Sequence, residues 1–137
     1  MKSLIDISGG AFLALHSLAL MAARKPEKMN IRTISDRLDV SEAHLAKVMQ
    51  RLSKAGFVTS YRGPGGGFTL NKPADDISLL DIYECIEGKI ELGDCPLGRE
   101  ECMFKSCIFS DSLTRISTEI YNTLRGLKLA DFQDRLE

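Results

Sequence analysis

The sequence lacks a long apolar run, and this absence excludes a membrane-spanning helix. The longest apolar stretch, residues 11–23, is interrupted by His16 and Ser17 and is too short to cross a bilayer. It has neither a basic leader nor a small-residue cleavage site, so we expect no signal peptide. We therefore expect a cytoplasmic protein with no membrane partner. In that compartment thiols stay reduced, and clustered cysteines bind metal more often than they form disulfides.

Histidine is scarce, and the pattern typical of an enzyme is missing. The 137 residues contain two histidines, without a nucleophile–base pair or a glycine-rich phosphate loop between a strand and a helix. Internal repeats and low-complexity segments are absent as well. The length fits one domain, and an apolar fraction of 44% allows a proper core. We expect one small domain that is not an enzyme.

The net charge of −1 conceals an asymmetry between the two halves of the chain. Residues 1–75 hold eleven Lys and Arg against six Asp and Glu, a net +5. Residues 76–137 hold seven against thirteen, a net −6. A basic first half suits contact with an anionic partner, although solvated faces of either sign also arise by chance.

The first apolar segment, residues 8–24, has the spacing of a buried helix. We expect it to end at Lys25 and Pro26, because proline disfavours helix at the preceding residue. His16 lies within this apolar segment and is expected to be a packed core histidine. The expected inward side comprises Phe12, Leu15, Leu18, Ala19 and Ala22.

The next segments have the organisation of a helix-turn-helix. A short helix over residues 30–38 is followed by a tight turn at Asp39. Ser41 then caps a third helix, residues 41–55, by accepting a backbone N–H of its first turn. Gly56 is a typical helix end. The inner face of the third helix should carry Leu45, Val48, Met49 and Leu52.

A β-hairpin should follow directly, which makes the unit a winged helix. Residues 57–61 are β-branched and aromatic, residues 62–67 form a turn, and residues 68–70 return. The turn contains four glycines in five positions, more than a hairpin needs. Gly65 and Gly66 could let the backbone approach an anionic surface closely. The alternative is a merely flexible turn.

Two helices are expected in the second half. Residues 78–87 have the pattern of a capped amphipathic helix, with Leu79, Ile82 and Ile86 inward. A long helix begins at Asp111, and its apolar stripe suits a partner helix in a homodimer. The stripe could alternatively pack on its own domain. It consists of Leu113, Ile116, Ile120, Leu124 and Leu127.

Together these elements predict a mainly α fold, a winged helix-turn-helix with a two-stranded β wing and a long C-terminal dimerisation helix. Residues 1–75 would form the DNA-binding domain. Residues 76–110 would form a linker helix and a cysteine loop, and residues 111–137 the dimerisation helix and tail.

In a helix-turn-helix protein the second helix enters the major groove of DNA. Positions on its outer side can neutralise phosphates or reach base edges, or can simply be solvated. An arginine at the entrance of a glycine-rich wing suits a narrow minor groove. The candidate DNA-binding residues are Ser41, His44, Lys47, Arg51, Arg62, Gly65 and Gly66.

Three cysteines fall within the thirteen residues 95–107, with gaps of six and four residues. Thiolates are the usual protein ligands of iron–sulfur clusters, and this spacing lets one loop wrap a cluster from one side. The spacing differs from the tight knuckles of common zinc sites. Iron–sulfur, zinc and redox-active or inert thiols all remain open on spacing alone. The metal candidates are Cys95, Cys102 and Cys107, with Arg99 and Lys105 placed to offset negative charge.

The wing sequence, residues 56–70, and the clustered cysteines resemble the Rrf-two family of bacterial transcriptional regulators, typified by IscR, NsrR, RirA and CymR. The resemblance spans nearly the whole chain. It implies an operator-binding homodimer, most often a repressor, in which Arg62 reaches the minor groove. It also implies an iron–sulfur cluster, of 2Fe–2S or 4Fe–4S type, on the three cysteines. The implied signals are nitric oxide, redox state and iron or cluster supply.

The resemblance implies that a fourth ligand lies outside the cysteine loop. NsrR uses an aspartate near the N-terminus of the partner subunit, and Asp6 is the candidate here. His16, Cys85, Asp111, water and a small thiol are alternatives, with Cys85 also expected to be a small buried apolar residue. The family further contains regulators controlled by thiols or by a partner protein. That mode, and a purely structural zinc site, are the alternative interpretations.

Overall fold

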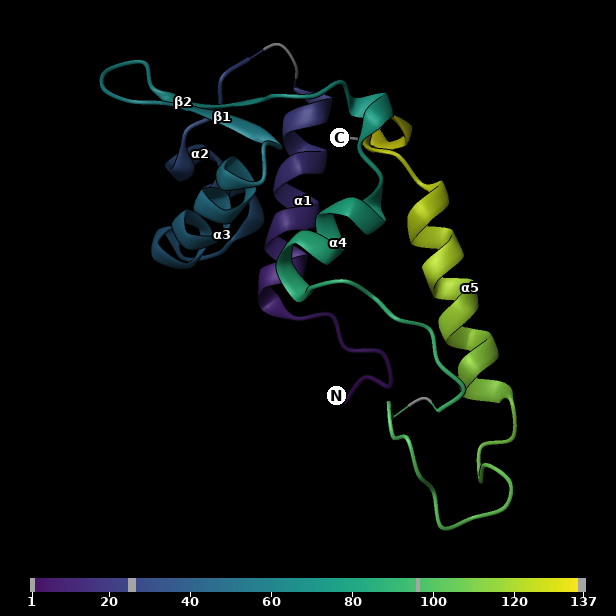
Figure 1. Ribbon diagram of the computed structural model, residues 1–137. Coiled ribbons are helices and arrows are strands. Elements are labelled where there is room, and N and C mark those ends of the chain that lie inside the picture. The colour runs from purple at the N-terminus through teal and green to yellow at the C-terminus, as the bar shows by residue number, and fades with distance from the viewer. Residues whose placement is uncertain (1, 25–26, 96, 136–137) are drawn as a thin grey trace.

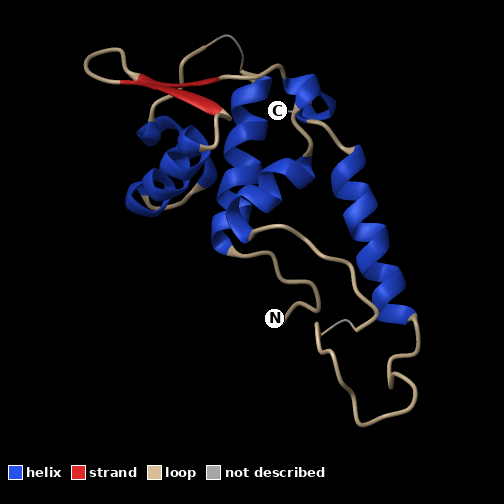
Figure 2. Ribbon diagram, viewed as in Figure 1, coloured by secondary structure: helices blue, strands red, loops and turns tan. Residues whose placement is uncertain are grey.

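The structure is a computed structural model that describes residues 2–24, 27–95 and 97–135. Its elements run α1 (Gly9–Ala23), α2 (Ile31–Leu38), α3 (Glu42–Lys54), β1 (Val58–Tyr61), β2 (Gly67–Leu70), α4 (Leu79–Glu87) and α5 (Ser112–Gly126). Short 3-10 turns, η1 (Ala74–Asp76) and η2 (Leu129–Phe132), precede α4 and follow α5. The mainly helical winged-helix prediction is confirmed, and Figure 2 shows the two strands at one end of a helical molecule.

The core lies between α1, α2, α3 and α4, with η2 closing one side. α1 runs through the centre of the molecule, and α4 crosses it (Figure 1). Ile77, Ile82 and Leu129 are buried together with residues of the first three helices, so the second half of the chain completes the core of the first. The division into segments at residues 75 and 110 stays a prediction. The fully buried large side chains include Leu13, Leu18, Ile34, Leu45, Met49 and Leu52.

Local capping explains where most helices begin. Ser41 Oγ accepts the backbone N–H of His44 at 3.2 Å, as predicted, and this bond satisfies one free donor of the first turn of α3. Asp39 takes the left-handed conformation between α2 and α3, with φ 54°. At α4, Ser78 and Asp81 form a reciprocal capping box, in which Ser78 Oγ accepts the N–H of Asp81 at 3.0 Å.

α1 corrects two predictions. Phe12 was expected to point inward but is 40% exposed, and His16 was expected in the core but is exposed. The two rings lie 4.0 Å apart, centroid to centroid, on the open side of α1. The helix is apolar on every side, so its spacing could not indicate which face is buried. The predicted end at Lys25 and Pro26 lies outside the described residues. The buried side is Ala11, Leu13, Ala14, Ser17, Leu18, Leu20, Met21 and Ala22.

α5 stands apart from the core and packs against α4 (Figure 1). Asp111 lies at its N-cap, and the helix ends at Gly126, so Leu127 of the predicted stripe follows the last turn. All residues of α5 are described, and none is buried. Ile116 and Ile120 are 45% and 39% exposed, respectively. No helix in the described part of the chain is long and apolar enough to span a membrane.

Candidate DNA-binding surface and cysteine loop

The outer side of α3 is open to solvent where the helix-turn-helix would meet DNA. Its inner face buries Leu45, Val48, Met49 and Leu52, as predicted. This burial fixes the rotation of the helix, so Ser41, His44 and Lys47 are exposed on the opposite side. A capped, amphipathic helix with an exposed polar face is the form in which a recognition helix enters a major groove.

Arg51 is exposed on the same helix, but its guanidinium is turned toward α4. Arg51 Nη2 donates to the carbonyl oxygen of Ile86 at 2.9 Å and to that of Cys85 at 3.3 Å. These carbonyls belong to the last turn of α4, where such groups have no partner within the helix. The structure therefore gives Arg51 an intramolecular role, and its contact with DNA stays a prediction.

The wing is a short antiparallel hairpin with a tight glycine turn. Val58 pairs with Leu70 and Tyr61 pairs with Gly67, and Arg62 is exposed at the start of the turn. Gly65 has φ 73°, a conformation that suits glycine. A Cβ at Gly66 would lie only 2.5 Å from the carbonyl oxygen of Tyr61. The turn itself thus favours glycine at position 65 through its backbone conformation and leaves no space for a side chain at position 66, in addition to any close approach to DNA.

The cysteine loop extends beyond the body of the molecule, away from the wing (Figure 1). Cys95 is half-buried, while Cys102 and Cys107 are exposed, and all three are free thiols. They line one hollow of about 510 Å³. The predicted cations Arg99 and Lys105 line the same hollow, together with the carboxylates Asp94 and Glu100. Soft thiolate donors around one hollow, next to cations, suit an iron–sulfur cluster.

The thiol of Cys95 has surroundings that favour its charged form. Hydrogen bonding from the backbone N–H of Arg99, and then from that of Leu97, holds the pKa of Cys95 below its usual range. Cys85 behaves in the opposite way, because burial raises its pKa despite the nearby charge of Arg51. Thiolates are the form that binds metal, so Cys95 is the better prepared ligand of the two.

The thiols line one hollow but are not gathered around a point. Within residues 2–24, 27–95 and 97–135, no three His, Cys, Asp or Glu side chains come close enough to hold a metal ion. The described lining of the hollow includes none of the fourth-ligand candidates Asp6, His16 and Cys85. The carboxylates that do line it, Asp94 and Glu100, were not among the predicted site residues, although Asp94 directly precedes Cys95 in the sequence.

A family model described as an iron-dependent transcriptional regulator, Rrf2, matches residues 7–135. The chain belongs to the Rrf2 family. It is 33% identical over 125 residues to YwgB of Bacillus subtilis, a candidate HTH-type transcriptional regulator, with 88% of this chain and 80% of that protein covered. It is 30% identical to the HTH-type transcriptional regulator IscR of Vibrio atlanticus, over 88% of this chain and 69% of that protein.

Solved structures of Rrf2-type regulators share the fold. The structure of CymR, described as the global cysteine regulator of B. subtilis, superposes with a TM-score of 0.79 at 24% identity, covering 98% of this chain and all of that one. The structure of IscR of T. potens superposes with a TM-score of 0.76 at 23% identity, covering 98% of this chain and 90% of that one. The winged-helix fold and the family are thus both confirmed.

As an Rrf2 regulator, the chain is a DNA-binding transcriptional regulator. Its relatives and structural neighbours are regulators rather than enzymes, which confirms the expectation that this chain is not an enzyme. The relatives named IscR are compatible with an iron–sulfur cofactor.

Proposed function

We propose that the chain is a cytoplasmic, homodimeric repressor whose operator affinity depends on an iron–sulfur cluster in the cysteine loop. The observation that carries the proposal is the shared hollow lined by Cys95, Cys102 and Cys107 in a chain that also presents a helix-turn-helix and wing. The relatives named IscR support the same interpretation.

DNA contact would use the exposed side of α3 and the wing. Lys47 would neutralise a phosphate, His44 would donate to a base edge or phosphate, and Ser41 would contact the backbone at the N-terminus of α3. Arg62 would enter the minor groove beside the wing. The wing turn of Gly65 and Gly66 would let the backbone approach DNA closely.

The dimer would form through α5. Its residues are all at least partly exposed, although its apolar stripe spans the helix. An apolar stripe at this spacing is stabilised when a second helix covers it. Symmetric pairing of two such helices would place two recognition helices for the two half-sites of an operator.

The cluster, of 2Fe–2S or 4Fe–4S type, would be held by Cys95, Cys102 and Cys107, with Asp6 of the second protomer as the proposed fourth ligand. When bound, it would supply a centre whose integrity responds to nitric oxide, redox state or iron and cluster supply. The three thiols line one hollow, although they are not gathered around the position of a single metal ion. Arg99 and Lys105 would offset the negative charge of the thiolates.

Anaerobic purification followed by iron, zinc and acid-labile sulfide analysis tests the proposal. We expect iron and sulfide in the wild type, and their loss in Cys102→Ala and Cys107→Ala. Asp6→Ala tests the proposed fourth ligand. Asp94→Ala is the matched control, because Asp94 is a carboxylate that lines the hollow. Zinc without sulfide would instead establish a structural metal site.

Control by thiols is a second candidate, favoured by the exposure of Cys102 and Cys107 and by the fold shared with the cysteine regulator CymR. A thiol- or partner-controlled regulator would repress normally without iron. Operator binding by metal-free protein that responds to thiol oxidation, or to an added partner protein, would favour this alternative over the cluster.

A further inference from the structure

The last turn of α4 is joined to three separate parts of the chain. The first is the recognition helix, through the two hydrogen bonds from Arg51 to the carbonyls of Cys85 and Ile86. The second is the start of α1, because Ser8 Oγ donates to the carboxylate of Glu87. This small region therefore connects elements that are far apart in the sequence.

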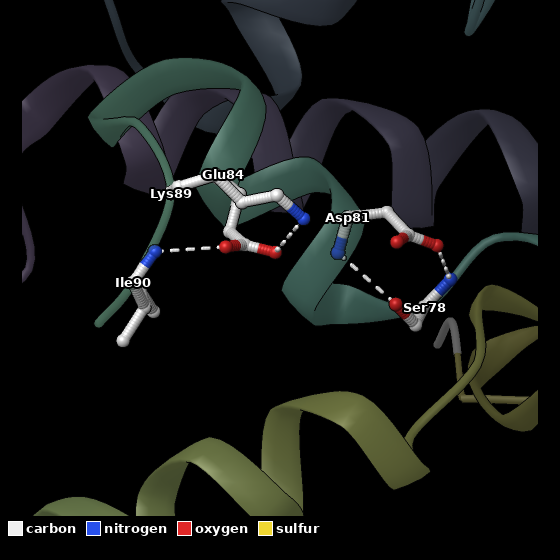
Figure 3. A network of polar contacts seen from close by, with 5 residues as sticks. All are labelled: Ser78, Asp81, Glu84, Lys89 and Ile90. Atoms are coloured by element: carbon white, nitrogen blue, oxygen red, sulfur yellow. Dashed lines mark hydrogen bonds and ion pairs between the residues drawn. The ribbon is translucent and has the colours of Figure 1, made fainter. Parts of the chain in front are cut away.

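The third part is the segment that leads into the cysteine loop. Glu84 Oε2 accepts the backbone N–H of Ile90 at 2.8 Å, and the ammonium of Lys89 lies 3.8 Å from the same carboxylate (Figure 3). The chain then continues to Cys95. On its N-terminal side, the loop is thus connected through this short segment to the end of α4, where Arg51 is bound.

The start of α1 also lies against the recognition helix. A Cβ added at Gly9 would stand 3.3 Å from Cε1 of His44, so the ring of His44 lies close to that glycine. α1 begins next to Ser8, which is bonded to Glu87 of α4. The recognition helix is therefore bonded to α4 through Arg51 and lies next to the start of α1 at His44.

We propose that Arg51 is a positioning residue that couples the recognition helix to the cysteine loop through the last turn of α4. The proposal rests on the proposed function in one respect, that the loop is the sensing element. The guanidinium of Arg51 donates to two adjacent carbonyls of α4, so a shift of α4 would be transmitted to α3. Lys47 lies one turn earlier on α3, is exposed, and provides the matched comparison.

Arg51→Lys is the discriminating variant, because lysine keeps the charge that a phosphate contact needs, while its nitrogen lies one bond closer to the backbone than Nη2, the single atom of Arg51 that donates to both carbonyls. Arg51→Gln removes the charge as well, and Lys47→Gln removes a comparable charge without touching α4. All variants are full-length proteins, compared well below the lowest melting midpoint among them. The DNA is a duplex selected from random sequences with the wild-type protein.

The first measurement uses cluster-free protein and follows alkylation of Cys95 by N-ethylmaleimide, resolved by mass spectrometry, with and without the duplex. Coupling between two sites is reciprocal, so DNA binding should change the rate at which Cys95 in the loop is alkylated. At saturating DNA, we expect the alkylation rate of Cys95 to change in the wild type and in Lys47→Gln. We expect no such change in Arg51→Lys and Arg51→Gln. The loop lies away from the wing, so direct shielding by DNA does not explain such a change (Figure 1).

The second measurement is the salt dependence of operator affinity. Loss of a phosphate contact lowers the slope by about one. We expect that reduction in Lys47→Gln and no reduction in Arg51→Gln, because a positioning residue contributes no phosphate contact. An Arg51→Lys protein that keeps the wild-type change in Cys95 alkylation overturns the proposal, as does a wild type whose Cys95 does not respond to DNA.

These outcomes are distinguishable from failure of the proposed function. If cluster-loaded and cluster-free wild type bind the duplex equally, cluster sensing fails. An alkylation change that depends on Arg51 would still support the coupling in that case. If the cluster controls affinity equally in wild type and in Arg51→Lys, the proposed function stands and the role of Arg51 is overturned.

Discussion

Replacing Gly66 with alanine should remove the contribution of the wing to operator binding while leaving the core folded. The added Cβ would lie 2.5 Å from the carbonyl oxygen of Tyr61 and 2.7 Å from that of Gly63. Both contacts are with backbone, so a side-chain rotation cannot relieve them, and the turn has to open. The hydrogen bond from the N–H of Gly66 to the carbonyl of Gly63, 2.9 Å long, would then be lost.

The opened turn should also disturb the proposed DNA contact, because a backbone atom of Arg62 lies close to that Cβ. The carbonyl carbon of Arg62 lies 3.1 Å from it, so the residue proposed to enter the minor groove must move with the turn. A specific arginine contact is worth about 1–3 kcal/mol, and about 1.4 kcal/mol corresponds to a tenfold change in affinity. We therefore expect Gly66→Ala to weaken operator binding by a factor of about 5 to 140.

Gly65→Ala is the matched control. Its φ of 73° is left-handed, which costs alanine roughly 1–2 kcal/mol, but a Cβ there meets nothing within 4 Å. Fluorescence anisotropy with a labelled operator should show a much smaller loss than for Gly66→Ala. Combining Gly66→Ala with Arg62→Ala should add little to either change alone, because both remove the same contact. Wild-type affinity in Gly66→Ala would refute this account of the wing.

Three further predictions concern the other surfaces. Arg62→Ala should weaken operator binding and lower its salt slope by about one, whereas an unchanged slope would show that Arg62 does not contact DNA charge. Ile120→Glu places a charge within the exposed stripe of α5 and should shift the protein from dimer to monomer in sedimentation. The control Glu119→Gln, one residue earlier, should leave the dimer intact. If Ile120→Glu remained a dimer, α5 would be excluded as the interface. Alkylation proceeds through the thiolate. In cluster-free protein it should therefore begin at lower pH for Cys95, whose pKa is lowered, than for Cys85, whose pKa is raised. The reverse order would contradict the opposite pKa shifts of the two thiols.

Local chemistry made much of the fold predictable. The Ser41 cap, the inner face of α3 and the cap of α4 depend on residues close together in sequence, and the structure confirms them. The hairpin was likewise predictable from its β-branched residues and glycines, with β1 beginning at Val58 instead of Phe57 and β2 at Gly67 instead of Phe68.

Features that depend on distant residues were not predictable. Arg51 was predicted to face DNA, and that contact stays a prediction. Its bonds to α4 could not be predicted, because the partners are 34 and 35 positions away and are backbone carbonyls without a sequence signature. Phe12 and His16 were placed inward, since a helix that is apolar all around does not indicate its buried face. The spacing of the cysteines indicated a common site but could not reveal that Asp94 and Glu100 share the hollow.

The most direct test of the central claim compares operator affinity of anaerobically purified protein before and after nitric oxide treatment, at one stated salt concentration. Iron and sulfide are measured on the same samples. Coupling between two sites in allosteric proteins typically changes affinity by a factor of about 5–150, and we predict a change in this range that is absent in Cys102→Ala. Equal affinity in both states of an iron–sulfur-loaded wild type would contradict control by the cysteine loop.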